Sequence, residues 1–128
     1  MKSMILLVLI GMVQASFGQV DDCGKFRNGK FEIIDPQYGN SIIERKGDEQ
    51  VEYGSGSGLK LRFKVEWVGE CVYTLQLKKV LKNPKGYVLP KEMILTVEII
   101  EMKENSYVQR STSNLYDKVV ESELVRME

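Results

Sequence analysis

The stretch "LKLRFKVEWVGECVYTLQLKK", Leu59 to Lys79, contains two runs of alternating apolar and polar residues on either side of Gly69. Apolar side chains recur at every second position in both runs, and this period of two is typical of half-buried antiparallel strands. The stretch therefore predicts a β-hairpin with one apolar face. The side chains expected on that face are Leu59, Leu61, Phe63, Val65, Trp67, Cys71, Tyr73, Leu75 and Leu77.

The rest of the chain beyond residue 23 has the same character, with turn residues such as Asp35-Pro36 and Gly47-Asp48 between short apolar segments. Six more strands are expected at 24–34, 41–46, 49–53, 92–102, 106–113 and 117–127, with no convincing helix among them. We predict an all-β fold: a meander of about eight antiparallel strands. Closure into an up-and-down barrel is its simplest form, because closure removes unpaired edges. An open curled sheet, or half-barrel, and a two-sheet sandwich are the alternatives.

The first 18 residues, "MKSMILLVLIGMVQASFG", have the parts of a secretory signal peptide in the expected order. Lys2 precedes an apolar run from Met4 to Val13, and small residues, including Ser16 and Gly18, follow. We expect a secreted or periplasmic protein, cleaved after Gly18, with one mature domain of residues 19–128. A membrane anchor is the alternative, but the apolar run is about half of the ~20 residues that a spanning helix needs.

Cys23 and Cys71 are the only two cysteines of the chain. Exported cysteines tend to oxidise, and two cysteines allow one pairing, so we predict a Cys23–Cys71 disulfide. Two free buried thiols, or a reactive Cys71, are the alternatives. A lipidated Cys23 is not expected, because "QVDD" precedes it and lipid attachment needs a small residue directly before the cysteine.

Composition narrows the range of functions. Histidine is absent, which excludes Ser-His-Asp triads, Cys-His pairs and histidine-based zinc sites. The 18 basic and 18 acidic residues balance, so no strong field attracts nucleic acid or an anionic membrane. We therefore expect no catalysis, no cofactor, no metal site, no nucleic-acid partner and no membrane insertion after signal cleavage.

Several segments together resemble a family of small secreted proteins of flavobacteria and other Bacteroidota. They are "CGKFRNGKFEI", "IIERKGDEQVEY", "FKVEWVGECVYTL", "ILTVEIIE" and "SYVQRSTS", in the same order. The two cysteines and the run from Trp67 to Leu75 are the most specific parts. The family has no assigned activity, so the resemblance implies export and a lipocalin-like small barrel or half-barrel. Some members carry a topoisomerase IV label, which an exported chain without an ATP site or acidic metal cluster does not support.

A barrel of eight strands has an interior that side chains either fill or leave open for one small ligand. The candidate lining residues belong to the apolar face of the hairpin and to the strand at 106–113. The residues that would line a ligand pocket are Phe63, Val65, Trp67, Tyr73, Leu75 and Tyr107, together with Leu61 and Leu77. An ordinary filled core is the alternative, because 110 mature residues leave little spare volume.

The last two strands and one loop carry polar residues that the apolar pattern does not explain. Either face of 106–113 and 117–127 is partly polar, which indicates hydrogen bonds among these side chains or to a ligand. An Arg110–Glu pair across adjacent strands is the simpler account. The lysines near the proline-containing loop either bind a polyanion or keep the surface soluble; they are Lys78, Lys79, Lys82, Lys85 and Lys91.

Taken together, these features predict an exported β-barrel module that binds a small apolar or amphipathic ligand without transforming it. A structural or protein-interaction role, with a filled core and an exposed apolar patch on "ILTVEII", is the alternative.

Overall fold

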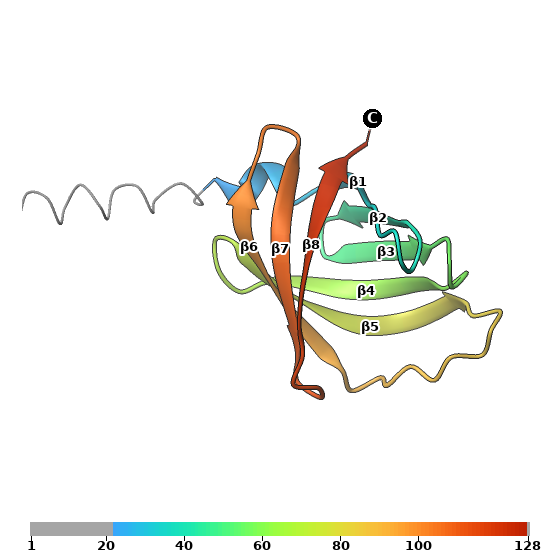
Figure 1. Cartoon of the computed structure of the whole chain (residues 1–128). Helices are drawn as coiled ribbons and strands as arrows, with labels where there is room; N and C mark the ends of the chain where they lie inside the picture. The colour runs from blue at the N-terminus through green and yellow to red at the C-terminus, as the bar shows by residue number, and fades with distance from the viewer. Residues whose placement is uncertain (1–21, 128) are drawn as a thin grey trace, which may run out of the picture.

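The computed structural model describes residues 22–127, so the predicted signal peptide lies outside the described residues. These residues form one short 3-10 helix and eight strands (Figure 1). The elements are η2 (Cys23–Phe26), β1 (Gly29–Ile33), β2 (Ser41–Lys46), β3 (Glu49–Gly54), β4 (Lys60–Trp67), β5 (Val72–Lys82), β6 (Ile94–Met102), β7 (Ser106–Ser113) and β8 (Val119–Arg126).

The strands form a closed barrel in chain order, and every neighbouring pair is antiparallel. The predicted all-β meander is thus confirmed, and the barrel is closed. The closing contact is short, because β1 and β8 pair only at Phe31–Arg126 and Glu32–Val125. Strands β6 to β8 run across the direction of β2 to β5, so the barrel resembles two packed sheets joined at their corners (Figure 1).

One strand begins later than the sequence predicts. The segment 24–34 was expected to be extended from Gly24, but Phe26 belongs to η2 and β1 begins at Gly29. The Phe26 side chain is nevertheless fully buried, because the short helix lies across one end of the barrel and points this ring inward. The apolar residue was therefore correctly expected in the interior, although its backbone is helical.

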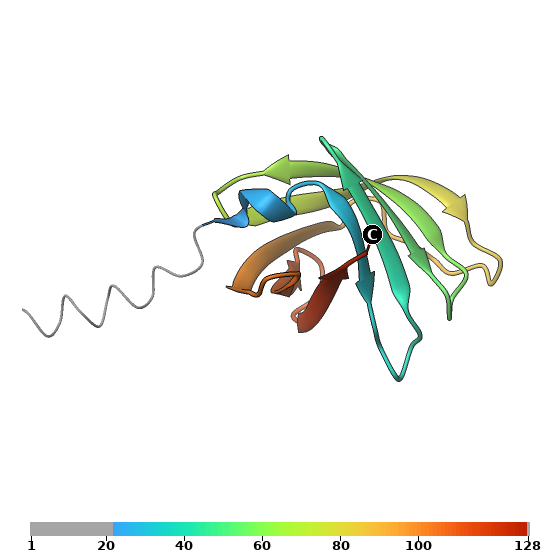
Figure 2. The ribbon, with the colours of Figure 1, turned by 90° about the horizontal axis from the view of Figure 1, so that it is seen from above.

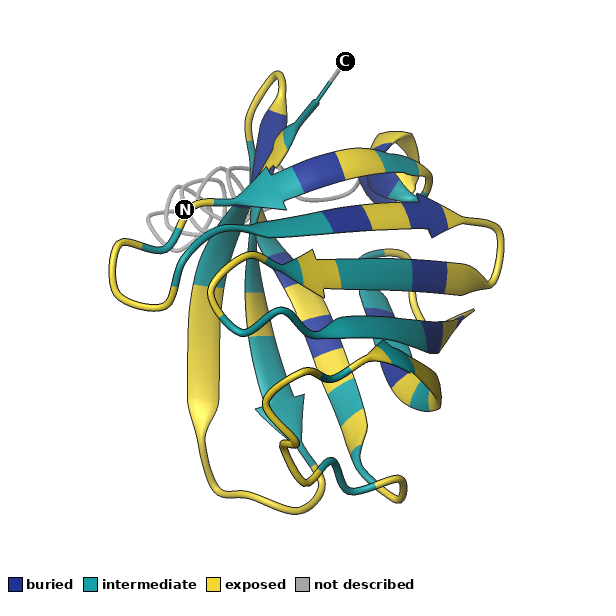
Figure 3. Ribbon diagram, turned by 90° about the vertical axis from the view of Figure 1, so that its right-hand side faces the viewer, coloured by how far each residue is buried: buried dark blue, intermediate teal, exposed yellow. Residues whose placement is uncertain are grey.

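Burial alternates from residue to residue along parts of β2, β4 and β6, as expected for strands with one face toward the interior (Figure 3). In the central hairpin, Phe63, Val65, Tyr73 and Leu75 are buried, whereas Lys64, Glu66 and Gln76 are exposed. Trp67 pairs with Tyr73 across β4 and β5, as the alternation predicts.

The two ends of the barrel differ. Helix η2 covers one end, next to the β4–β5 and β6–β7 turns (Figure 2). The opposite end is bordered by the loops 34–40, 55–59, 83–93 and 114–118, and we call it the mouth. Inward side chains near the mouth, such as Ile33, Leu61, Leu77 and Leu95, are only half-buried.

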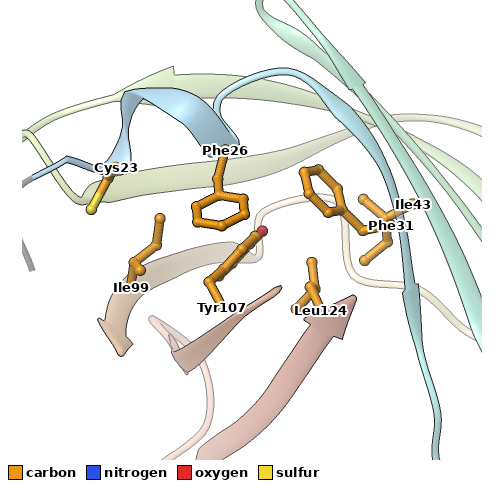
Figure 4. Close-up of a cluster of buried hydrophobic side chains, with 7 residues drawn as sticks. All are labelled: Cys23, Phe26, Phe31, Ile43, Ile99, Tyr107 and Leu124. Carbon is orange, nitrogen blue, oxygen red and sulfur yellow. The ribbon is translucent and has the colours of Figure 1, made fainter. Parts of the chain in front are cut away.

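Two groups of buried residues form the core. The group at the closed end contains Cys23, Phe26, Phe31, Ile43, Ile99, Tyr107 and Leu124 (Figure 4). Its rings pack edge-on or tilted, with centroids of Phe26 and Tyr107 4.9 Å apart. The second group, in the middle of the barrel, contains Phe63, Val65, Tyr73, Leu75 and Val97. Trp67 packs against both groups.

A disulfide joins Cys23 to Cys71, with Cα atoms 5.4 Å apart. The predicted pairing is confirmed, and the alternatives of free or reactive thiols are wrong. The bond ties η2 to the turn between β4 and β5, which fixes the cover onto the closed end. No helix within residues 22–127 is long and apolar enough to cross a membrane.

Candidate binding site in the barrel interior

Arg45 on β2 points into the barrel and is only 2% exposed. Its cross-strand neighbour on β3, Gln50, is 1% exposed and also points into the barrel. An arginine is almost never buried unless it is paired, because the desolvation of a charge is costly. The surroundings of Arg45 therefore show how the barrel interior accommodates this cation.

All three nitrogen atoms of the Arg45 guanidinium donate hydrogen bonds. Nε donates to Gln50 Oε1 at 2.9 Å, and Nη1 donates to the Phe26 carbonyl oxygen at 2.7 Å. Nη2 donates to the hydroxyl oxygens of Tyr73 and Tyr107, both at 2.8 Å. The guanidinium carbon also lies 4.6 Å from the Tyr73 ring centroid, close enough for a cation–π contact. Neutral acceptors and ring faces thus surround the charge.

The hydrogen bonds continue on both sides of Arg45 across the barrel. On one side, Gln50 Nε2 donates to Glu52 Oε2 at 3.4 Å. On the other, the Tyr73 hydroxyl donates to Gln109 Oε1 at 3.1 Å, and Gln109 Nε2 donates to Ser122 Oγ at 3.3 Å. We call this set the polar floor; it contains Arg45, Gln50, Glu52, Tyr73, Tyr107, Gln109 and Ser122.

The two ends of the polar floor are less buried than its middle. Glu52, Gln109 and Ser122 are half-buried, whereas Arg45, Tyr73 and Tyr107 are buried. Toward the mouth the inward side chains are half-buried, and we call the region that they border the lumen. The groups that a molecule in the lumen would meet first are a carboxylate, an amide and a hydroxyl.

Burial also shifts the protonation equilibria of the floor. It raises the pKa of the Glu52 carboxyl above its usual value, and Gln50 and Arg45 offset only part of that rise. Burial and the neighbouring Tyr107 raise the pKa of Tyr73 well above its usual value, so this phenol stays protonated and can donate. Burial lowers the pKa of Arg45, but Tyr73, Tyr107 and Glu52 raise it more, so Arg45 stays cationic.

Apolar side chains form the wall of the lumen on β4 to β6. Leu61 is the cross-strand neighbour of Glu52, and Leu75 is that of Leu95. Leu61, Leu77 and Leu95 pack against the middle core group on one side and are half-buried, unlike the fully buried residues of that group. The opposite wall on β7 and β8 carries hydroxyls instead, among them Ser111. The lumen is therefore apolar on one side and polar on the other.

A hollow of about 190 Å³ opens at the mouth end of the lumen. Four of the residues around it point inward from β6, β7 and β8, Thr112 lies on the outer face of β7, and the other three belong to the mouth loops. They are Leu95, Ser111, Ser113 and Val120, with Met93, Thr112, Tyr116 and Lys118. The volume is below the range usual for drug-sized ligands, so it suits a small molecule or a single chain.

A second hollow, of about 340 Å³, lies where β1 and β8 separate beyond their two paired positions. Ile33 from β1 and Ser122 from β8 line it, and both point inward. Because Ser122 is also part of the polar floor, this gap leads from the side of the barrel toward the floor. The larger hollow of about 850 Å³ lies on the outer face of β1 to β3, among outward charged residues such as Lys30 and Glu44, and is unrelated to the lumen.

The predicted lining residues occupy two depths. Phe63, Val65, Tyr73 and Leu75 lie in the middle group and Tyr107 at the closed end, and all five are at most 5% exposed. They pack the base of the barrel, and only Tyr73 and Tyr107 take part in the polar floor. Trp67 lies nearer the covered end. Its ring centroid is 4.6 Å from the Tyr73 ring centroid and 4.4 Å from the guanidinium carbon of Arg27.

Three polar residues of the floor, Arg45, Gln50 and Glu52, were not predicted from the sequence, whereas the face of β7 and β8 that carries Gln109 and Ser122 was left open. Arg45 lies in "SIIERK", where the apolar pair Ile42-Ile43 leaves the inward face ambiguous. A signal was nonetheless present, because two inward tyrosines need hydrogen-bond partners for their hydroxyls. On β7 and β8 the ambiguity is resolved: Tyr107, Gln109, Leu124 and Ser122 face inward.

On the outer surface, the predicted pair of Arg110 with a glutamate across β7 and β8 is present, and the exposure of the loop lysines fits both of their proposed roles. Arg110 Nη2 lies 3.0 Å from Glu121 Oε2 in an exposed ion pair across β7 and β8. The five lysines singled out near the proline-containing loop are all exposed. Within residues 22–127, no three side chains of the kinds that bind metals lie close enough to hold an ion.

Comparison with protein-family models, with curated proteins and with solved structures gives no match to this chain.

Proposed function

We propose that the protein is an exported binding module that holds one small amphipathic ligand in its lumen. The observation that carries this proposal is the polar floor beneath a half-buried apolar wall. A barrel that only had to be stable would fill its interior with close-packed apolar side chains. Here Leu61, Leu77 and Leu95 remain partly accessible above a connected set of polar groups.

The apolar and polar walls of the lumen would contact different parts of the ligand. The apolar part would lie along Leu61, Leu77 and Leu95, where removal of apolar surface from water supplies the free energy. The polar part would meet Glu52, Gln109 and Ser122, whose hydrogen bonds fix its orientation. Entry would be through the mouth or through the gap between β1 and β8.

The proposal includes an exported location and a binding role without catalysis. The disulfide supports an oxidising compartment outside the cytoplasm, as the leader sequence predicts. The protein would then be a secreted or periplasmic member of the lipocalin-like family that the sequence resembles. The floor has no histidine, and its carboxylate and phenols form a static hydrogen-bonded set, so we propose binding rather than catalysis.

Native mass spectrometry of the protein purified from its own host tests this proposal. We expect an additional mass that is lost on denaturation, which would be the ligand. Binding of the uncharged fluorescent probe N-phenyl-1-naphthylamine to the emptied protein would give the same answer independently. A clean mass of the chain alone, together with no probe binding, would overturn the proposal.

A pair of tryptophan variants on β7 separates lumen binding from surface binding. Ser111 points inward beside Val97 and Val120, so Ser111→Trp would fill the lumen and abolish probe binding. Arg110 is exposed on the outer face, so Arg110→Trp is the matched control and should bind as the wild type does. Equal binding by both variants would place the probe outside the lumen.

A protein-interaction role is the second candidate. It was expected to use the outer face of β6, but only Ile94 there is an exposed large apolar residue, at 37%. The mouth loops carry more: Val88 is 93% exposed, Tyr38 71% and Tyr116 58%. Such a ring of apolar side chains favours contact with another surface. Loss of a partner on substitution of Val88 and Tyr38, with probe binding intact, would support this role.

A further inference from the structure

Glu52 is a carboxylate that points into the lumen with only one of its oxygen atoms engaged. Its position is fixed by its neighbours, because it pairs with Ile43 on β2 and Leu61 on β4, and both point inward. The 3.4 Å contact from Gln50 is at the long end of hydrogen-bond distances. Among the described residues, no other hydrogen bond reaches this carboxylate. It is the one ionisable group of the polar floor with free acceptor capacity.

Arg45 cannot serve as the group that binds a ligand anion. Its three nitrogen atoms already donate to Gln50, to the Phe26 carbonyl and to both tyrosines, at 2.7 to 2.9 Å. It is 2% exposed and lies beneath Glu52 in the floor. A carboxylate in the lumen would meet Glu52, with a charge of its own sign, before it could reach Arg45. The floor therefore disfavours an anionic head group.

The remaining accessible groups of the floor also accept hydrogen bonds. Gln109 uses its oxygen to accept from Tyr73 and its nitrogen to donate to Ser122. Ser122 in the floor and Ser111, which points inward from β7 outside the floor, present hydroxyls, which act as acceptors as well as donors. A head group with several N–H donors and a positive charge can pair with Glu52 and donate further bonds to these oxygens.

We propose that the ligand is an amphipathic amine, whose ammonium group pairs with Glu52 while its hydrocarbon part lies along Leu61, Leu77 and Leu95. This inference rests on the proposed function and makes it more specific. The cross-strand position of Leu61 beside Glu52 places the charged and apolar contacts next to each other. The part of the protein that the structure describes provides no ion-pair partner for the Glu52 carboxylate, and an unpaired, half-buried charge is unfavourable in free energy. A protonated amine would be that partner.

The test is displacement of N-phenyl-1-naphthylamine by three ligands with the same ten-carbon chain. Decylamine, decanol and decanoic acid differ only in their head groups, and the full chain expressed with its own leader is used at neutral pH. We expect decylamine to displace the probe at a concentration about tenfold lower than decanoate. Decanol should lie between them, because it can donate one hydrogen bond but carries no charge.

Two substitutions assign the preference to Glu52. Glu52→Gln keeps the shape of the side chain and removes its charge, so decylamine should lose its advantage over decanoate. Glu44→Gln on β2, an exposed outward residue, is the matched control and should leave all three affinities unchanged. Thermal unfolding of each variant shows whether it is folded. Should Glu52→Gln not fold, the wild-type comparison of decylamine with decanoate still decides the matter.

The possible outcomes separate this inference from the function on which it rests. If the probe does not bind at all, the proposed function fails. If the probe binds but decylamine and decanoate displace it equally, or if Glu52→Gln keeps the preference for the amine, only the present inference is wrong. In that case Glu52 serves to balance the charge of Arg45 through Gln50.

Discussion

At the scale of single residues, the buried Arg45 organises the base of the barrel. Its hydrogen bonds reach η2 through the Phe26 carbonyl, β3 through Gln50, and β5 and β7 through Tyr73 and Tyr107. A hydrogen-bonded guanidinium inside a protein specifies geometry, because each neighbour must sit where a donor points. Four separate elements are thereby held in one arrangement.

Replacement of Arg45 by methionine should therefore be severe. Arg45→Met keeps much of the side-chain volume but leaves the Phe26 carbonyl and the Gln50 amide oxygen without their donor. We expect the free energy of unfolding to fall by about 3 kcal/mol, measured by urea denaturation. Arg110→Met, which removes an exposed ion pair, is the control and should cost less than about 1 kcal/mol. A variant at Arg45 as stable as the wild type would show that the network is dispensable.

Replacement of Glu52, unlike that of Arg45, should increase the stability of the folded protein at neutral pH. Because burial raises its pKa in the folded state, the folded protein holds this proton more tightly than the unfolded chain does. Its contribution to stability is thus full below the unfolded pKa and is lost as pH rises through the folded pKa. We expect Glu52→Gln to be more stable than the wild type at pH 7. This advantage should shrink as the pH falls toward 4.5 in urea denaturation, and an advantage that grew on acidification would contradict the assignment.

The extent to which the sequence predicts these residues follows from their chemistry. Phe63, Val65 and Leu75 were expected in the interior because alternation is unbroken through the central hairpin. Arg45 was not expected there, since charge is ordinarily a sign of an outward position. Its burial depends on partners from η2, β5 and β7, which lie up to 62 positions away along the chain. No local pattern can reveal contacts of that range.

At the scale of elements, η2 depends on links to the rest of the barrel. The disulfide joins it to the β4–β5 turn, and the Phe26 ring packs against Tyr107. With so few residues, the helix has little stability of its own. The cover over the closed end is therefore maintained by tertiary contacts and by the covalent bond.

Removal of the disulfide should loosen the closed end. The bond spans 48 positions, for which the chain-entropy model gives roughly 4 kcal/mol as an upper figure. We expect the double variant Cys23→Ser and Cys71→Ser to unfold at a lower urea concentration, with the change approaching that figure. Hydrogen exchange should accelerate most at residues 23–28. Unchanged exchange there, despite the lost bond, would show that packing alone holds η2.

Arg126 strengthens the short contact between β8 and β1. Its Nη1 donates to the Asn28 carbonyl at 3.3 Å and its Nη2 to the Lys25 carbonyl, while the guanidinium carbon lies 5.0 Å from the Phe31 ring centroid. Gly29, with φ of 146°, allows this approach, because a side chain there would occupy the position of Arg126 Nη1. One arginine thus joins the last strand to the first strand and to η2.

Truncation of this side chain should open the barrel at its narrowest pairing. For Arg126→Ala we expect a loss of about 2 kcal/mol in the free energy of unfolding, by urea denaturation, from two hydrogen bonds and the ring contacts. Hydrogen exchange should rise at the paired residues Phe31, Glu32 and Val125. Lys103→Ala, which removes an exposed ion pair with Glu123, is the control. Equal exchange in both variants would argue that Arg126 does not hold the closure.

At the scale of the whole molecule, the eight-strand meander could be predicted from the sequence. The extent to which side chains fill the barrel interior could not. Short turns between alternating segments are local signals, and closure follows from the need to pair edges. Whether side chains fill the interior depends on how every wall packs together. The polar side of the lumen arises because β7 and β8 turn Gln109, Ser111 and Ser122 inward, a choice that their sequences leave open.

The barrel divides into a packed closed end and a lumen whose side chains are more accessible. Residues near η2 are buried and covalently fixed, whereas those near the mouth are half-buried. Stability and binding are thereby assigned to opposite ends of one barrel. The substitutions at Arg45 and Arg126 should lower the stability of the barrel. Ser111→Trp should abolish ligand binding without a comparable loss of stability.

A titration of the isotope-labelled protein with N-phenyl-1-naphthylamine, followed by backbone amide NMR, tests this claim most directly. We predict saturable shifts at Glu52, Leu61, Leu95 and Ser111, whose side chains border the lumen, with little change at Cys23 or Ile99 at the closed end. An absence of shifts, or shifts confined to exposed mouth-loop residues such as Val88, would contradict it.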